Sequence, residues 1–128
     1  MSSHHPKARE RWKSEPDDQD YPAARSYLSL LVPGKDARRY AKLLSREKRL
    51  SHYKAKDILR ASGLALLAPD DHELEKDRAK IRDGIKLSPV LLVRGEPLWV
   101  ADGYHRICAS YHLDEDALIP CRLVDRLA

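Results

Sequence analysis

The chain has 128 residues, of which 42% are hydrophobic and 34% are charged, and it contains no Phe. This length suits one domain and leaves too little for two ordinary hydrophobic cores. No apolar run approaches the roughly 18 to 20 residues that a membrane-spanning helix needs, and the polar N-terminus lacks the apolar stretch of a secretory signal. The two cysteines, Cys108 and Cys121, indicate reduced thiols rather than a disulfide framework. We therefore expect a cytoplasmic protein without a membrane partner.

The net charge of +4 is unevenly distributed along the chain. Residues 1–25 carry equal numbers of basic and acidic side chains, residues 35–60 carry ten basic and three acidic ones, and residues 61–128 carry nine basic and twelve acidic ones. The positive charge is thus an internal block. Such a block favours an anionic partner for one face of the protein.

The N-terminal quarter of the chain predicts an arm followed by a strand. Residues 1–25 are polar, contain three prolines and show no apolar periodicity, which is typical of a flexible arm. We expect one domain over residues 26–128. Residues 26–32 are predicted to form its first strand, which ends at the turn signal Pro33-Gly34.

Two helices are predicted next. Residues 35–49 place their apolar side chains on one face and only basic side chains on the opposite face. A second helix is expected between Ser51, as N-cap, and Gly63. The apolar stretch 64–68 is consistent with either a buried loop or a strand.

The C-terminal half alternates helix and strand patterns. The predicted elements are a charged helix over 72–83 capped by Asp70-Asp71 and closed by Gly84, strands over 87–93 and 98–101, a helix over 104–112 and a strand over 119–124. The first two strands are separated by a four-residue turn signal, so we expect them to be antiparallel. The fold class predicted is α+β, with a small mixed or antiparallel sheet flanked by helices.

The segment around Gly103 carries the strongest chemical signal. It is predicted to run from a strand through a sharp turn at Gly103 into a helix whose first turn holds His105 and Arg106. Unpaired backbone N–H groups and the positive end of the helix dipole meet at such a turn. Arg106 adds a bidentate donor, and His105 adds a donor whose charge depends on pH. This pattern predicts a binding site for a phosphate group.

The same residues resemble a known family. Asp-Gly-Tyr-His-Arg at 102–106, between a strand and a helix and preceded by Lys-Ile-Arg-Asp-Gly at 80–84 and Ser-Pro-Val-Leu-Leu-Val at 88–93, is similar to the ParB/sulfiredoxin superfamily. The resemblance covers residues 74–124 well and residues 26–127 loosely. It implies a ParB/sulfiredoxin-like domain that binds ATP, ADP or CTP with Mg²⁺. The nucleotide-binding residues that it implies are Gly103, Tyr104, His105 and Arg106.

The resemblance leaves the activity open between binding, nucleotide hydrolysis and phosphate transfer to a small molecule. The amino-acid sequence of the motif is most similar to that of a kinase branch of the superfamily, in which an acidic residue acts as general base. Asp102 is the candidate for that role or for a metal-associated carboxylate, although an Asp before a helix is more often its N-cap. Tyr104 stands where sulfiredoxins carry their reactive cysteine, which disfavours sulfinate reduction.

A second hypothesis is a non-enzymatic module that binds DNA or RNA. It rests on the basic face of the helix predicted over 35–49, for which the residues considered are Arg38, Arg39, Lys42, Arg46 and Arg49. Such a face would contact the phosphate backbone without reading sequence. The competing interpretation is a solvated surface that keeps the protein soluble. A homodimer and a domain that acts only through protein partners are further open alternatives.

Two other groups favour structural roles. His105, Cys108 and His112 share one side of a predicted helix, with Cys121 on the next strand, which is the kind of grouping that a zinc ion needs. Cys108 and Cys121 also fit core positions, and the spacing of the histidines and Cys108 is not that of an established zinc motif. We therefore predict no metal site. An aromatic ring could stack on a nucleotide base, yet Trp99, in a strand, is more typical of core packing.

Overall fold

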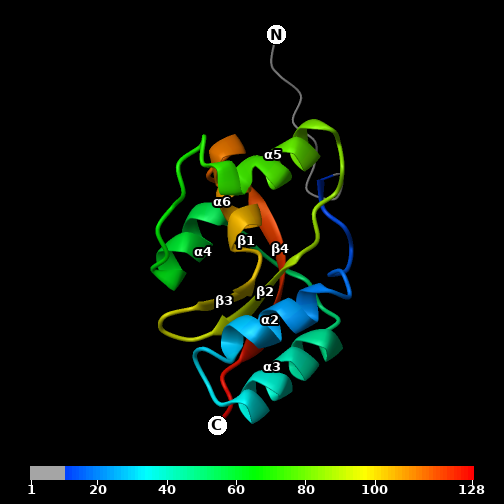
Figure 1. Cartoon of the computed structure of the whole chain (residues 1–128), viewed down its shortest axis with the longest axis vertical. Coiled ribbons are helices and arrows are strands. Elements are labelled where there is room, and N and C mark those ends of the chain that lie inside the picture. The colour runs from blue at the N-terminus through cyan, green and yellow to red at the C-terminus, as the bar shows by residue number, and fades with distance from the viewer. Residues whose placement is uncertain (1–10) are drawn as a thin grey trace.

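A four-stranded mixed sheet organises the computed structural model, which describes residues 11–128. The strands are β1 (Ser51–Lys54), β2 (Val90–Arg94), β3 (Trp99–Asp102) and β4 (Leu118–Asp125). The helices are α2 (Asp20–Leu28), α3 (Gly34–Arg46), α4 (Ala55–Ser62), α5 (Glu75–Arg82) and α6 (Tyr104–Leu113), with a short 3-10 helix η1 (His72–Leu74). Figure 1 shows α2 and α3 together on one side of the sheet and α4, α5 and α6 on the other. The predicted α+β class with flanking helices is confirmed.

The strand order is β1-β4-β2-β3. The central pair, β2 and β4, is parallel, whereas β1 pairs with β4 and β3 pairs with β2 in antiparallel fashion. The predicted antiparallel hairpin of β2 and β3 is therefore confirmed. Residues 90–93 of β2 are all buried, as expected for a parallel strand that is covered on both faces.

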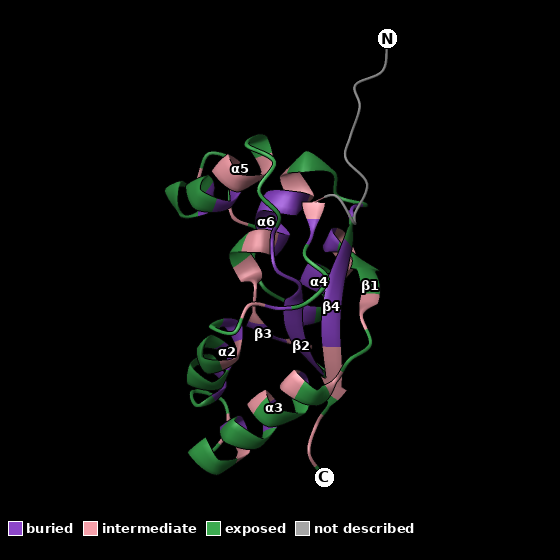
Figure 2. Cartoon of the chain, turned by 90° about the vertical axis from the view of Figure 1, so that its right-hand side faces the viewer, coloured by how far each residue is buried: buried purple, intermediate pink, exposed green. Residues whose placement is uncertain are grey.

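The sheet separates two hydrophobic cores. Val90 and Leu92 of β2 contribute to the core beneath α4, η1 and α6, and the alternate residues Leu91 and Val93 contribute to the core beneath α2 and α3. This alternation follows from the period of two along a strand. Figure 2 shows the buried strands between the two groups of helices. The molecule thus has three layers.

A buried arginine joins β4 to α2 and α3. Arg122 is only 3% exposed, and its Nη1 donates to the Tyr21 hydroxyl at 2.7 Å and to the Ser45 and Leu44 carbonyls at 3.1 and 3.2 Å. Those carbonyls belong to the last turn of α3, where helix carbonyls lack partners within the helix. Arg122 therefore supplies, from inside the protein, hydrogen-bond donors to the carbonyls at the C-terminal end of α3.

The prediction of a flexible arm over residues 1–25 is wrong from Trp12 onward; residues 1–10 lie outside the described part of the chain. Trp12 is 4% exposed and forms a β-bridge with Leu87. The predicted strand over 26–32 is also wrong, because the chain is helical from Asp20 to Leu28. Ala24 and Leu28, one helical turn apart, are fully buried in the second core, so tertiary packing favours the helix.

Other predicted elements are confirmed with shifted ends. The helix predicted over 35–49 ends at Arg46. Ser51 is not an N-cap, because residues 51–54 form β1 against β4 and the helix starts at Ala55. The stretch 64–68 is neither a strand nor a buried loop, since all of its residues except Leu67 are exposed.

The predicted helix over 72–83 is divided into η1 and α5, and Asp71 caps it by accepting a hydrogen bond from the Glu73 N–H at 2.9 Å. The predicted helix over 104–112 and strand over 119–124 match α6 and β4 closely. None of the helices in residues 11–128 combines the length and apolar character that crossing a lipid bilayer requires.

Candidate functional site

The turn between β3 and α6 requires glycine for two reasons. Gly103 has φ of +112°, a conformation that residues with a side chain rarely adopt. A Cβ at this position would also lie 2.8 Å from the Cβ of Val90 and closer still to its Cγ1. Gly103 is the N-cap of α6, and no side chain caps this helix. Its first N–H groups therefore remain available to a ligand.

Arg106 points back into the protein beneath this turn. Its Nη2 lies 2.9 Å from Oδ2 of Asp102 and 3.9 Å from Oδ2 of Asp20. Asp102 is thus not the N-cap that its position suggested; it pairs with the arginine one turn further along α6. Arg106 and the two carboxylates fix the β3–α6 turn against the start of α2.

Burial raises the pKa of Asp102, and this effect exceeds the opposing effect of Arg106, while nearby Asp20 acts in the same direction as burial. Asp102 in the folded protein consequently holds its proton more tightly than in the unfolded chain. By linkage, ionising it costs stability.

The first prediction concerns this carboxyl. We compare the free energy of unfolding of the wild type with that of Asp102→Asn. The wild-type value minus the variant value should fall as pH rises from about 3.9, the ordinary aspartate pKa, toward the raised pKa of Asp102 in the folded protein. Above the raised value the difference should be constant, because Asp102 is then ionised in both states. Urea unfolding at a series of pH values measures this difference. A difference independent of pH in that range would contradict the prediction.

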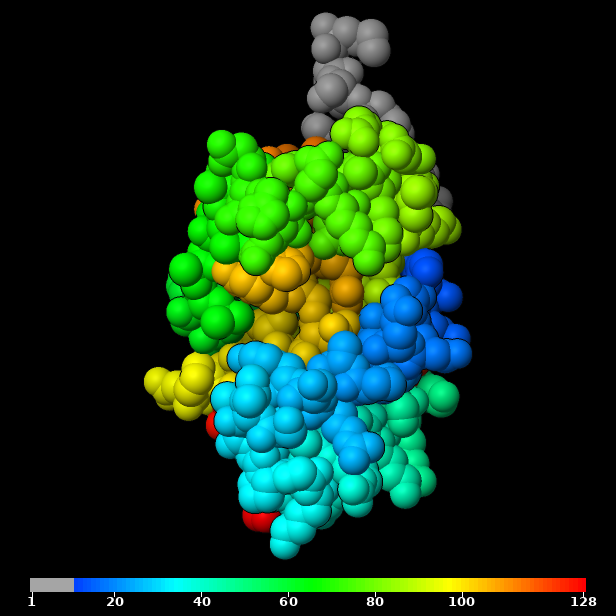
Figure 3. Space-filling model, viewed as in Figure 1, coloured from blue at the N-terminus to red at the C-terminus, as the bar shows by residue number. Residues whose placement is uncertain are grey.

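A polar pocket of about 210 Å³ opens at the N-terminus of α6. Lys76 and Lys80 of α5, Ser88, and the turn residues 102–106 line it together with Asp17, Gln19, Asp20, Glu73 and Asp77. The exposed His105 places its Nε2 3.4 Å from Oε2 of Glu73 at the rim. In Figure 3 this face is hollowed between the blue α2 region and the green segment that includes η1 and α5, with the orange start of α6 at the floor.

A second pocket, of about 310 Å³, lies on the other side of the same turn. It shares residues 102–105 with the polar pocket, but its remaining lining is apolar or aromatic: Ala23, Tyr27, Leu64, Val100 and Ala101. The Tyr104 hydroxyl donates to the Ala65 carbonyl and thereby ties the 64–68 loop to α6. We refer to the two adjoining pockets as the Gly103 cleft.

All of the predicted residues 102–106 line the polar pocket, but they differ in what else they contact. Gly103, Tyr104 and His105 line both pockets, whereas Arg106 lines only the polar one and is held by carboxylates. Trp99 lies in neither pocket; it packs edge-on against Tyr40 with ring centroids 6.0 Å apart, as the core interpretation predicted.

Cys108 and Cys121 are fully buried in the first core, which confirms their predicted packing role. Burial raises the pKa of both thiols, that of Cys121 to about 12. Among residues 11–128, no group of three or more His, Cys, Asp or Glu side chains is arranged to hold a metal ion. Mg²⁺ needs only one or two carboxylates when phosphate oxygens supply other ligands, and the carboxylates of Asp17 and Glu73 line the polar pocket, where they contact Lys13 and His105.

Lys76, Lys80 and Asp20 are among the residues of the polar pocket that sequence reasoning missed. Lys76 and Lys80 were expected only on a charged surface helix, although their spacing of four places both on one face. Asp20 was assigned to the arm, and no local pattern pairs it with an arginine 86 positions later.

No family model matches the chain, and comparison with curated proteins and with solved structures likewise yields no match.

Proposed function

We propose that the Gly103 cleft binds a nucleotide, with its phosphates in the polar pocket and its base and sugar in the apolar pocket. The observation that carries this proposal is the uncapped N-terminus of α6, which opens onto a pocket lined by Lys76, Lys80 and His105. Backbone N–H groups, a helix dipole and flexible cations form a typical phosphate site. The resemblance to the ParB/sulfiredoxin superfamily points to the same turn.

Charge balance favours a metal-bound nucleotide over free phosphate. The polar pocket holds five carboxylates against Lys76, Lys80, Arg106 and a neutral or charged His105. A bare polyphosphate would meet net negative charge there. Mg²⁺ bound with the phosphates would supply the missing positive charge, and the carboxylates that could hold it are among those that line the polar pocket, such as Glu73 and Asp17.

The roles of the side chains differ. Lys76 and Lys80 have no ion-pair partner within residues 11–128 and can contact phosphate oxygens. His105 contacts Glu73 at the rim, and Arg106 acts mainly as a positioning residue because Asp102 and Asp20 hold it. Tyr27 and Tyr104 offer aromatic surface to the base. Asp102 supports the turn through Arg106, which favours a positioning role over that of a general base.

The experiment is calorimetric titration of the full chain with ATP, ADP, CTP and GTP, with and without Mg²⁺. We expect saturable binding of at least one nucleotide with a Kd below about 1 mM that requires Mg²⁺. The double variant Lys76→Ala/Lys80→Ala should bind at least about tenfold more weakly, because it loses two charge-assisted contacts to phosphate.

The matched control is Arg82→Ala/Lys86→Ala, which removes the same charge from exposed positions outside the Gly103 cleft. It should bind like the wild type. Absence of binding to all four nucleotides, or equal loss in the control, would overturn the proposal.

A further inference from the structure

A groove runs along the outer face of the α2–α3 hairpin, away from the sheet and separate from the Gly103 cleft. Its volume is about 660 Å³. Small side chains of both helices form much of it: Ser26, Ser29, Gly34, Ala37, Ala41 and Ser45. The side chains of Tyr21, Arg25 and Arg38 border the space that these small residues leave open, and an elongated ligand can lie there. We call this the α2–α3 groove.

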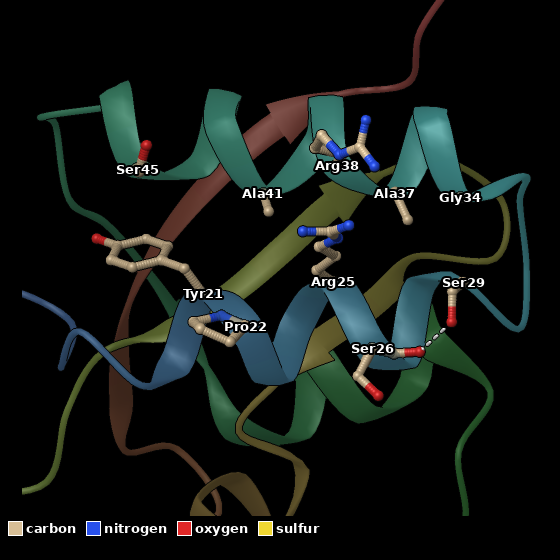
Figure 4. A pocket seen from close by; sticks show the side chains of 10 residues that line it. All are labelled: Tyr21, Pro22, Arg25, Ser26, Ser29, Gly34, Ala37, Arg38, Ala41 and Ser45. Atoms are coloured by element: carbon tan, nitrogen blue, oxygen red, sulfur yellow. Dashed lines mark hydrogen bonds between the residues drawn. The ribbon is translucent and has the colours of Figure 1, made fainter.

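The charged side chains that line the groove are both arginines, one from each helix. Figure 4 shows Arg25 reaching from α2 toward α3, with Arg38 across from it on α3. Within residues 11–128, neither guanidinium has an ion-pair or hydrogen-bond partner. Two like charges that face one space without a counter-ion are relieved by an anion between them.

Further basic side chains of α3 continue the row of positive charge beyond the groove. Arg38, Lys42 and Arg46 are spaced four residues apart, so consecutive cations are about 6 Å from one another along the helix axis. Arg39 makes only a long 3.9 Å contact with Asp36. A chain of regularly spaced anions is the complementary partner for such a row.

Tyr21 adds a neutral donor at one end of the groove. Its hydroxyl accepts a hydrogen bond from Arg122, so its own proton remains free for a ligand. Burial raises the pKa of Tyr21, which keeps the hydroxyl protonated at neutral pH. A hydroxyl donor beside two arginines suits a phosphodiester oxygen.

We propose that the α2–α3 groove binds a single strand of nucleic acid through its phosphate backbone, without reading its sequence. A single strand is favoured over a duplex because packed helices lie only about 8 to 10 Å apart, and both arginines must reach one backbone. A nucleic acid is favoured over an acidic helix because its phosphates are regularly spaced, as are the cations Arg38, Lys42 and Arg46 of α3. Sequence reading is absent because no Asn or Gln lines the groove.

The test is fluorescence anisotropy of the full chain with a labelled oligothymidylate of about 16 nucleotides, at about 50 mM and about 200 mM salt. Arg25→Ala/Arg38→Ala should weaken binding about tenfold at the lower salt. It should also make the slope of log K against log salt shallower by about 1.4, the value for two lost contacts to a single strand.

The matched control is Arg60→Ala/Arg82→Ala, which removes two exposed arginines away from the groove. It should bind like the wild type, as should Lys76→Ala/Lys80→Ala, so the result is independent of the nucleotide proposal. Equal weakening in the Arg60/Arg82 control, unchanged binding by the groove variant, or no binding at the lower salt would overturn the proposal. So would a duplex of the same length, or polyglutamate, binding as tightly as the single strand.

Discussion

Replacing Arg122 with alanine should lower the free energy of unfolding by about 3 kcal/mol or more. The substitution removes three hydrogen bonds, each of which contributes about 1 kcal/mol, and leaves a cavity beneath α2 and α3. It also removes the partner of the Leu44 and Ser45 carbonyls at the end of α3. Urea unfolding followed by circular dichroism measures the change. An unaltered slope of the free energy of unfolding against urea concentration would show that the variant and the wild type expose similar surface on unfolding.

Arg94→Ala is the control for this substitution. Arg94 lies on the neighbouring strand β2, but it is exposed and pairs with Asp125 at 2.8 Å. Exposed ion pairs contribute less than about 1 kcal/mol, so this variant should unfold close to the wild type. If Arg122→Ala were as mild as Arg94→Ala, water rather than Arg122 would be satisfying the end of α3.

Gly103→Ala should be comparably destabilising, by about 2 to 6 kcal/mol. The backbone conformation at this position costs a residue with a side chain about 1 to 3 kcal/mol, and forcing a methyl group against Val90 costs about 1 to 3 kcal/mol more. The proposed nucleotide binding should be lost even where the variant is folded, because relief of the clash displaces the start of α6. Urea unfolding and calorimetric titration at low temperature separate the two effects.

Gly34→Ala provides the contrast. A Cβ at Gly34 meets no atom within 4 Å, and alanine is favoured over glycine in a helix by up to about 1 kcal/mol. This variant should be neutral or slightly more stable. The destabilisation by Gly103→Ala should also be smaller in a Val90→Ala background, since Cγ1, the nearer of the two contacting atoms, is then absent while Cβ remains. Equal destabilisation in both backgrounds would argue against the contact.

Local patterns predicted the elements whose sequence signals agree with their tertiary environment. The β2–β3 hairpin has two apolar runs on either side of a Gly- and Pro-containing turn, and α6 begins at a glycine that ends a strand. In these segments the local preference and the packing favour the same structure. The helix α3 was predicted for the same reason, because its buried residues Ala37, Tyr40 and Leu44 recur at helical spacing.

The incorrect predictions concern segments whose structure depends on distant partners. The run from Tyr27 to Val32 has the composition of a strand, but Leu30 is 81% exposed while Leu28 is buried against β3 and α3. Ser51–Lys54 forms a strand only because β4, about 70 residues later, offers its edge. Neither partner is visible in a local window of sequence.

The candidate site likewise has one part that a local stretch of sequence determines and another that depends on distant residues. Residues 102–106 could be predicted as one unit because they are consecutive and lie at a strand–helix junction. The pairing of Arg106 with Asp20 and the approach of Lys76 and Lys80 depend on how α2 and α5 pack around that junction. Sequence therefore predicted the position of the turn, and the packing of helices determines the chemistry around it.

The helix α2 lines both pockets that we propose as binding sites. Ala23 and Tyr27 on one side line the Gly103 cleft, and Arg25 and Ser26 on the other line the α2–α3 groove. Any ligand that shifts this nine-residue helix reshapes both sites at once. If a ligand in one pocket shifted α2 and changed the affinity of the other pocket, thermodynamic reciprocity would require the two ligands to alter each other's affinity by the same factor. A helix that packs like an ordinary structural element would then couple the two proposed sites.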